Sequence, residues 1–354
     1  MKIVSVVGAR PQFIKLAPLS KLIRKQHEEI LIHTGQHYDD EMSKVFFDEL
    51  CLPQPDINLN IGSGNHGVQT GKMMQGLEEI LLREKPDLII VFGDTNSTLA
   101  AALVAAKLLI PIAHVEAGLR SFNKKMPEEV NRILTDHLSH WLFSPSAVAV
   151  TNLRNEGIVN GVFDVGDIMY DAILSFREMI DEPSQRLQKY SVQSGGYILA
   201  TIHRAENTDE VDRLSRIIKL LDNTEFPVLF PVHPRTRKKI QDYGLNVNRN
   251  VRLVSPAGYF DIINLISNSK FVVTDSGGMQ KEAYYLKRSC ITLRDETEWV
   301  ETVASGWNYL VGISDELFQN AVNSIVKNTD HRTNGNIYGD GTASEKILNI
   351  LQLQ

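Results

Sequence analysis

Residues 2–26 read KIVSVVGARPQFIKLAPLSKLIRKQ, and this stretch contains a strand, a turn and a helix. The run Ile3–Val7 is almost wholly apolar, which is typical of a parallel strand buried on both faces. Pro11, a residue favoured at the first position of a helix, begins a segment in which apolar side chains recur at helical spacing up to Ile23. A strand that leads through a short turn into a helix predicts the start of a doubly wound α/β sheet.

The same alternation continues to the end of the chain. In the first half, further strands are predicted at Ile30–Thr34, Leu88–Gly93, Ile112–Glu116 and Trp141–Ser144. In the second half, strands are predicted at Tyr197–Ile202, Val228–Val232, Val251–Val254, Phe271–Thr274 and Cys290–Leu293, and helices at Val211–Leu221 and Ile262–Ser267. Strands separated by helices favour parallel sheets, and hence two Rossmann-like domains in tandem.

We place the first domain at residues 1–168, joined by a C-terminal helix at 342–354, and the second domain at 169–341. The segment Asp181–Gly196 is polar and contains Pro and Gly, so it marks the connection between the two halves. Because open α/β sheets bind ligands beyond the carboxyl ends of their strands, we expect an active-site cleft between the domains.

The composition is that of a globular protein, with 354 residues, 43% of them hydrophobic and 23% charged. The net charge of −6 argues against nucleic acid or an anionic membrane as the main partner. The N-terminal apolar run is too short for a signal peptide and no stretch approaches 18 apolar residues, so we expect a cytoplasmic protein. Cys51 and Cys290 show no pairing pattern and are expected to be reduced thiols.

Two turns after predicted strands have the composition of anion-binding loops. After the first strand, a tight turn at Gly8, the free N–H groups of a helix start and the charge of Arg10 would together hold a phosphate. At Ser276-Gly277-Gly278 the backbone can approach a diphosphate, and Glu282 follows within reach of a ribose diol. A plain strand-to-helix turn is the alternative for the first, and a glycine-mediated close contact between strand and helix is the alternative for the second.

Carboxylates follow strands of the first domain. Asp94 comes directly after a predicted strand, and Glu116 ends the next one along the chain. A carboxylate at the end of a buried strand is costly unless it has a partner or a role. Glu128 stands at a helix start with Arg132 four residues later on the same face, although a simple interaction with the helix dipole would also explain this Glu.

Histidines follow two strands of the second domain. His203 and His233 are candidates for an acid or for phosphate ligands, whereas His114 lies inside a predicted strand and is expected to be a core residue. No set of His, Cys and carboxylate residues has the spacing of a metal site, so we predict no metal and no cofactor.

In this order along the chain, the motifs resemble those of the non-hydrolysing UDP-N-acetylglucosamine 2-epimerase family, which has the GT-B fold. The resemblance covers nearly the whole chain, including a last helix that in this family packs back on the first domain. It rests on Gly8-Ala9-Arg10-Pro11 with Lys15, Gly93-Asp94-Thr95, His114-Val115-Glu116-Ala117-Gly118-Leu119-Arg120, Pro127-Glu128-Glu129 with Asn131-Arg132, His203-Arg204, Pro231-Val232-His233-Pro234, Thr274-Asp275-Ser276-Gly277-Gly278 and Tyr338-Gly339-Asp340-Gly341.

The resemblance implies a reaction on a UDP-linked 2-acetamido sugar. The family eliminates UDP across C1–C2 to give a 2-acetamidoglucal, and adds UDP back after reprotonation on the other face. It assigns catalysis to Asp94, Glu116, Glu128 and His203. It assigns substrate binding to Arg10, Lys15, Arg132, His233, Ser276, Gly277, Gly278 and Glu282. It also implies a homodimer that supplies precursors of surface polysaccharide.

Several positions depart from the UDP-N-acetylglucosamine branch of the family. Gln12 stands in place of Glu, Ala205 in place of Arg, Lys281 in place of Glu, and Trp299-Val300-Glu301 in place of Arg-Pro-Glu. These departures, with Gly35-Gln36-His37-Tyr38-Asp39 and Ser121-Phe122-Asn123, resemble the branch that acts on UDP-2,3-diacetamido-2,3-dideoxyglucuronate. In the first branch a Gln-His-Arg-Gln run helps to form an activating site. Tyr38 and Asp39 interrupt this run here, and Asn65-His66 replaces its downstream Arg-Gln.

Three other functions remain compatible with these motifs. A GT-B glycosyltransferase that uses a UDP-sugar would share the Ser276 loop and Glu282, but has no need for three carboxylates in the first domain. A hydrolysing epimerase would release free UDP, and a sugar-nucleotide sensor would bind without turnover.

Overall fold

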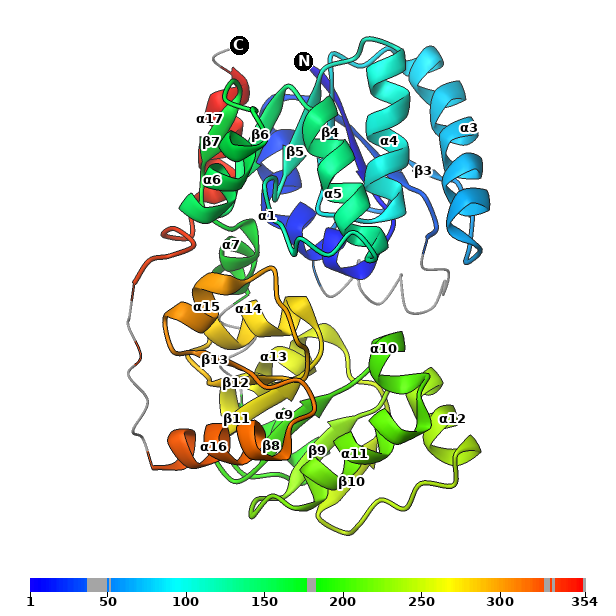
Figure 1. Cartoon of the computed structure of the whole chain (residues 1–354). Coiled ribbons are helices and arrows are strands. Elements are labelled where there is room, and N and C mark those ends of the chain that lie inside the picture. Colours follow the sequence, from blue (N-terminus) through cyan, green and yellow to red (C-terminus); the bar gives the residue numbers. More distant parts are fainter. Residues whose placement is uncertain (37–49, 51, 177–182, 328–331, 333–334, 353–354) are drawn as a thin grey trace. The chain divides into compact units, whose positions relative to one another are not determined.

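The computed structural model describes residues 1–36, 50, 52–176, 183–327, 332 and 335–352 (Figure 1). The chain forms two compact units, Met1–Ser175 with Asn336–Gln354 and Phe176–Gly335. Each unit is a parallel sheet with surrounding helices, so the predicted α/β class is confirmed. None of the helices in the described residues is long and apolar enough to cross a membrane.

The sheet of the first unit has the strand order β3-β2-β1-β4-β5-β6-β7, and all neighbouring pairs are parallel. Its strands are β1 (Lys2–Val7), β2 (Glu28–His33), β3 (Ile57–Asn58), β4 (Leu88–Phe92), β5 (Ile112–Val115), β6 (Trp141–Ser144) and β7 (Val162–Asp164). Its helices are α1 (Arg10–Gln26), α3 (His66–Glu84), α4 (Asn96–Lys107), α5 (Pro127–Leu138), α6 (Ala147–Asn155), α7 (Ile168–Ser175) and α17 (Ala343–Gln352).

The sheet of the second unit has the order β10-β9-β8-β11-β12-β13 and is also parallel. Its strands are β8 (Ile198–Thr201), β9 (Val228–Pro231), β10 (Val251–Val254), β11 (Phe271–Thr274), β12 (Cys290–Thr292) and β13 (Asn308–Leu310). Its helices are α9 (Pro183–Lys189), α10 (Ala205–Thr208), α11 (Val211–Asp222), α12 (Pro234–Asp242), α13 (Tyr259–Asn268), α14 (Gly277–Tyr285), α15 (Val300–Ala304) and α16 (Asp315–Val326).

Each sheet has its own hydrophobic core. In the first unit, buried residues of β1 and β4 pack with Met73 and Leu77 of α3 and with the alanines of α4. In the second unit, residues of β8, β9 and β11 pack with Leu214 of α11 and Phe318 of α16. The continuously apolar strands are therefore explained by burial on both faces of each sheet.

Both sheets reverse their strand order at one point. In the first unit this switch point lies between β1 and β4, and in the second between β8 and β11. Parallel α/β sheets bind ligands beyond the carboxyl ends of the strands at such a point. The segments that begin at Gly8, Gly93, Ile202 and Asp275 therefore start at the two positions where a ligand is expected.

All predicted strands are present, and Trp141–Ser144, Val251–Val254 and Phe271–Thr274 have the predicted bounds. The sequence did not predict β3, β7 and β13. These strands have only two or three residues each, and each contains an Asn or Asp, a residue type that is rare in strands and interrupts an apolar run.

The connection between the units lies earlier than the polar segment Asp181–Gly196 suggested. The second unit begins at Phe176, and that segment includes α9, which packs on α13. Residues 169–175, assigned to the second domain from the sequence, belong to the first unit because α7 packs against α1 and α17. Asp171 fixes this arrangement by accepting hydrogen bonds from the N–H groups of Ala343 (3.1 Å) and Ser344 (2.7 Å) at the start of α17.

Candidate active site

A buried ion pair lies at the carboxyl ends of β4 and β5. Glu116 directly follows β5, and its carboxylate pairs with the Lys15 ammonium of α1, each side chain being less than a tenth exposed. The expectation that a strand-end carboxylate needs a partner is confirmed. Glu116 also has a φ of 75°, a left-handed conformation that is strained for a residue with a side chain.

Gly93 makes room for this pair. Its φ is 62°, and a Cβ placed on it would lie 3.0 Å from Lys15 Nζ and 3.1 Å from Glu116 Oε2. A larger residue would therefore press on both charged groups, in a backbone conformation that favours glycine.

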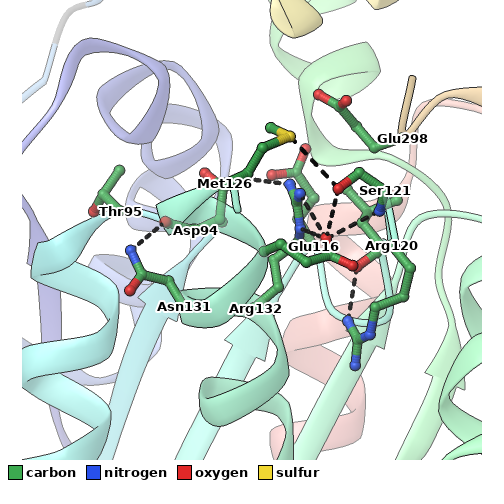
Figure 2. Close-up of polar contacts among 12 residues, drawn as sticks. Asp94, Thr95, Glu116, Arg120, Ser121, Met126, Asn131, Arg132 and Glu298 are labelled. Carbon is green, nitrogen blue, oxygen red and sulfur yellow. Dashed lines mark hydrogen bonds and ion pairs between the residues drawn. The ribbon is translucent and has the colours of Figure 1, made fainter. Parts of the chain in front are cut away.

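A second carboxylate–cation pair is formed by Asp94, the residue after Gly93, and Arg132. Arg132 of α5 donates to Asp94 Oδ2 at 2.6 Å, and Asn131 donates to the Asp94 carbonyl at 2.9 Å. Figure 2 shows Asp94, Asn131, Arg132 and Glu116 in one cluster, with the two α5 side chains extending toward Asp94. The first unit thus brings together four of its predicted site residues, namely Lys15, Asp94, Glu116 and Arg132.

The environment of Asp94 favours its protonated form. Desolvation raises the pKa of the Asp94 carboxyl, and the nearby charges of Glu116 and Glu128 raise it further. Arg132 and Lys15 oppose this shift without cancelling it. A carboxyl with a raised pKa is suited to hold and deliver a proton.

Glu129, which the sequence analysis did not single out, anchors this part of the site. It is 1% exposed, and it accepts hydrogen bonds from the N–H groups of Ser121 (2.9 Å) and Phe122 (2.8 Å) and from Arg132 NH2 (2.8 Å). Glu128, the residue predicted to share a face with Arg132, has an exposed side chain in the first turn of α5. Adjacent glutamates at a helix start look alike in sequence, and only the packing separates their roles.

The start of α1 differs from the predicted anion loop. The N–H groups of Gly8 (2.8 Å) and Ala9 (3.0 Å) both donate to Gln12 Oε1, so two of the expected free donors are occupied. Gly8 does not have a positive φ, and its role is close approach, because a Cβ there would lie 2.1 Å from the hydroxyl oxygens of Thr34 and Ser97. Arg10 is the first residue of the helix.

Gln12, one of the departures noted above, belongs to the core. Its amide nitrogen donates to the Phe92 carbonyl at 2.9 Å and to Thr98 Oγ1 at 3.0 Å, and its side chain is 1% exposed. An ionised glutamate has no hydrogen to donate to a carbonyl oxygen, so the amide suits this position.

In the second unit, Asp275 joins the two strand ends at the switch point. Its fully buried carboxylate accepts hydrogen bonds from the N–H groups of His203 (3.1 Å) and Arg204 (3.0 Å) and from Asn207 Nδ2 (3.0 Å). His203 has an exposed side chain, and its backbone is held by these bonds. Asp275 was recognised only as part of a motif, because sequence does not reveal a partner 72 residues away.

His203 and His233 lie near one another. Partial burial lowers the pKa of His233, and the charges of His203 and Arg235 lower it further. His233 also caps α12, because its ring accepts a hydrogen bond from the Arg235 N–H at 3.2 Å. A structural role for this histidine is thus shown, beside its predicted part in phosphate binding.

The Ser276-Gly277-Gly278 turn begins α14, with Ser276 at the N-cap and Glu282, 7% exposed, in the second turn. Gly277 permits a close approach, because a Cβ there would lie 2.3 Å from Glu298 Oε1 and 3.3 Å from Trp299 Nε1. The first-turn N–H groups of such a helix have no intrahelical acceptor, which suits an anion.

Two departures from the UDP-N-acetylglucosamine branch contact one another in this unit. Lys281 Nζ lies 4.0 Å from the centre of the Trp299 ring, and both side chains are buried. Arg294, also buried, donates to Glu298 Oε2 at 2.9 Å. A cation over an indole face is a favourable arrangement when both groups are removed from water.

Some of the sequence expectations concern residues outside those described, namely His37, Tyr38, Asp39 and Cys51. Gln36, the neighbour of the first three, is described, and its side-chain oxygen accepts from Ser97 N–H (3.0 Å) and Ser97 Oγ (2.7 Å). Within the described part of the chain, no three His, Cys, Asp or Glu side chains are grouped as a metal site.

Comparison with known proteins identifies relatives over the whole chain. The family model "UDP-N-acetylglucosamine 2-epimerase" matches residues 21–352. A "UDP-N-acetylglucosamine 2-epimerase homolog" of Methanococcus maripaludis is 55% identical, with 99% of both chains covered. The UDP-2,3-diacetamido-2,3-dideoxy-D-glucuronate 2-epimerase of Pseudomonas aeruginosa is 47% identical, again with 99% of both chains covered.

A solved structure agrees with the fold. The crystal structure of the Methanocaldococcus jannaschii UDP-GlcNAc 2-epimerase, in complex with UDP-GlcNAc and UDP, matches with a TM-score of 0.92. The two sequences are 43% identical, and 100% of each chain is covered. The GT-B fold expected from the sequence is therefore confirmed.

Proposed function

Because the chain belongs to the UDP-N-acetylglucosamine 2-epimerase family, we propose that it is a non-hydrolysing isomerase that inverts carbon 2 of a UDP-linked 2-acetamido sugar. The observation that carries the proposal is the pair of carboxylate–cation contacts at one switch point, the buried Lys15–Glu116 and the partly buried Arg132–Asp94. Inversion at C2 needs one group to remove a proton and another to return it on the opposite face. Two carboxylates with different surroundings meet this need.

The proposed reaction breaks and remakes two bonds. A carboxylate takes the C2 proton while the C1–O bond breaks, and the bonding pair leaves with UDP to give the 2-acetamidoglucal. Return of a proton to the other face of C2 and of UDP to C1 gives the epimer. We assign the proton transfers to Asp94, Glu116 and Glu128, with His203 as the fourth catalytic group.

The raised pKa of Asp94 supports a role as the carboxyl that holds a proton at the start of a half-reaction. Glu116, whose carboxylate pairs with the Lys15 ammonium, is the proposed acceptor of a proton. Lys15 and Arg132 thus do more than bind the sugar, since Lys15 pairs with Glu116 and Arg132 opposes the rise in the pKa of Asp94.

The second unit is proposed to hold UDP. The first-turn N–H groups of α14 and the Ser276-Gly277-Gly278 backbone would bind the departing diphosphate, with His203 and His233 as further hydrogen-bonding groups. Arg10 of the first unit is likewise proposed as a substrate-binding residue. Glu282 would bind the ribose diol. Because Asp275 fixes the His203–Arg204 backbone, these donors are held in place before the ligand binds.

A second substrate is favoured by a specific observation. The Lys281–Trp299 contact and the 47% identity with the Pseudomonas aeruginosa enzyme support UDP-2,3-diacetamido-2,3-dideoxyglucuronate as the sugar nucleotide. We propose it as the alternative to UDP-N-acetylglucosamine, and further propose that the protein is a cytoplasmic homodimer that serves polysaccharide precursor synthesis. Light scattering of the purified chain tests the dimer.

One NMR experiment in heavy water distinguishes the candidate functions. Each UDP-sugar is incubated with the protein, and we expect deuterium at C2, appearance of the epimer and an intact UDP linkage for one of them. Stoichiometric release of UDP would instead indicate hydrolysis. Absence of exchange with both sugars would contradict the epimerase and favour a transferase or a sensor.

A further inference from the structure

His114 of β5 is fully buried behind the Asp94–Glu116 cluster, and both of its ring nitrogens face oxygen atoms. Nδ1 lies 2.7 Å from Asp136 Oδ1, and Nε2 lies 2.8 Å from the Gly93 carbonyl oxygen. A backbone carbonyl is only an acceptor, so Nε2 must carry a hydrogen. One further proton must then lie between Nδ1 and Asp136.

The surroundings of Asp136 decide which of the two groups holds this proton. Its other oxygen, Oδ2, accepts hydrogen bonds from Arg120 NH1 at 2.7 Å and from the Gly118 N–H at 3.1 Å. Both donors stabilise an ionised carboxylate. An imidazole is also more basic than a carboxylate, with reference pKa values of about 6.5 and 3.9. The proton therefore belongs on the histidine.

The His114–Asp136 pair connects the two segments that carry the proposed catalytic carboxylates. On one side, the ring holds the carbonyl of Gly93, the residue before Asp94. On the other side, Asp136 holds the N–H of Gly118, two residues after Glu116. Neither His114 nor Asp136 was assigned a role in the reaction from the sequence.

We propose that His114 is an imidazolium in the folded protein and is a positioning residue that holds the Gly93–Asp94 and Glu116–Gly118 segments in register. The positioning role rests on the proposed function, whereas the charge of the ring does not. A neutral imidazole has one N–H donor, and a Gln amide has both of its donors on one nitrogen atom, so neither can hold the two acceptors that face different atoms of the ring. Misplacement of a reacting group by about 1 Å costs on the order of 10²-fold in rate.

The buried charges around the ring balance. Asp136 and Arg120 form one contact, and Arg120 also pairs with Glu156 through NH2 at 2.7 Å. His114, Asp136, Arg120 and Glu156 therefore form a chain of contacts that runs from the ring to the end of α6. The Lys15–Glu116 pair lies on the other side of Gly93. With the proton on the ring, His114 and Asp136 are an ion pair and the whole chain has no net charge, as the interior of a protein requires.

The charge of the ring is tested by two-bond ¹H–¹⁵N correlation spectra of the ¹⁵N-histidine-labelled full chain at pH 7.5. We expect one histidine with protons on both nitrogens and slow hydrogen exchange. His33 provides an internal comparison, because its Nδ1 accepts from the Gly35 N–H at 2.7 Å and so carries no proton. A spectrum in which every slowly exchanging histidine is a neutral tautomer would overturn the proposal, whether or not any variant folds.

The positioning role is tested with His114→Gln, and His137→Gln serves as the matched control because His137 is a half-exposed histidine of α5. We expect the first variant to lose the doubly protonated signal and to lower kcat by about 10- to 100-fold, with KM and UDP affinity changed less than about threefold. The control should keep the doubly protonated signal and the wild-type values of kcat, KM and UDP affinity. Unchanged kcat in a folded His114→Gln protein, or a parallel loss of UDP affinity, would contradict the role.

Failure of the proposed function and failure of the inference about His114 give different results. If the chain epimerises neither UDP-sugar, the kinetic comparison has no signal, yet the NMR spectrum still decides the charge of His114. If the chain is active and the ring is neutral, the proposed function stands and this inference is wrong.

Discussion

Glu116 combines two unfavourable features at one residue, a left-handed backbone conformation and a buried charge. The conformation is held by the N–H groups of Glu116 and Ala117, which both donate to the Phe143 carbonyl at 3.0 and 3.1 Å. The charge is compensated by Lys15. Strained residues that the surrounding structure holds in place are concentrated at functional sites, because the strain fixes a side chain in a direction that relaxed backbone would not give.

Replacement of Glu116 by Gln keeps the shape of the side chain and removes its charge. We expect turnover to fall by about 10²–10⁴-fold, the range for loss of a general acid or base, with UDP affinity largely unchanged. Glu79→Gln, which changes an exposed glutamate of α3, is the control. Rates come from NMR of the epimers and affinities from calorimetry. Equal losses of rate and of UDP affinity would mark Glu116 as structural.

Asp136 gives the first unit a pH dependence of known sign. Burial raises the pKa of this carboxyl, but His114 and Arg120 outweigh it and hold the pKa below its ordinary value. A depressed pKa contributes stability above the unfolded value of about 3.9, and this stability is lost as the pH falls through the folded pKa. We therefore expect the Tm of the wild type to fall more steeply below about pH 4 than that of Asp136→Asn, in scanning calorimetry from pH 3 to 6. Parallel curves would contradict this.

At the scale of elements, the strands and helices were predictable because burial leaves a direct pattern in the sequence. Apolar runs marked every strand of four or more residues and also the three-residue β12, whereas β3, β7 and β13 are short and each contains an Asn or Asp. The site was predictable only in part. The sequence placed Asp94, Glu116 and His203 after strands, but it did not reveal that Glu129 holds Arg132 or that Asp275 holds the His203 backbone. Such partners are fixed by tertiary packing, which residue type and spacing do not encode.

Lys281 and Trp299 illustrate the same limit. Each was recognised as a departure from the UDP-N-acetylglucosamine branch, but only the structure shows that the two side chains are in contact between α14 and the segment before α15. The UDP-N-acetylglucosamine branch has Glu and Arg at these positions, which are opposite charges. One favourable contact would thus replace another.

A reciprocal exchange tests this interpretation. Lys281→Glu removes the cation from the indole face, and Trp299→Arg places two cations together in a buried site, so each single change should lower the Tm. The double variant sets opposite charges against each other, and we expect it to regain most of the loss. We also expect its ratio of kcat/KM values to shift at least about tenfold toward UDP-N-acetylglucosamine relative to the diacetamido-uronate. Additive losses of Tm would show that the two residues do not interact.

At the scale of the whole molecule, the chemistry is divided between two units with separate cores. The first unit holds the carboxylates that would move the C2 proton, and the second holds the turn and the histidines that would bind the diphosphate. UDP alone contains the groups that the second unit is proposed to bind and lacks the sugar that the carboxylates would act on. The two ligands, UDP and the full sugar nucleotide, should therefore affect the units differently.

Hydrogen exchange of the full chain measures this difference. The first-turn N–H groups of α14 have no intrahelical acceptor, so they exchange readily until a ligand accepts from them. We expect UDP to slow exchange at residues 277–279 and to leave residues 93–96 and 116–118 unchanged. The full sugar nucleotide should protect all three segments. Glu282→Gln should weaken the effect of UDP, whereas Glu316→Gln, at an exposed glutamate of α16, should not. Protection of residues 93–96 by UDP alone would place the diphosphate on the first unit, and the roles proposed here for Ser276, Gly277 and Gly278 would then be wrong.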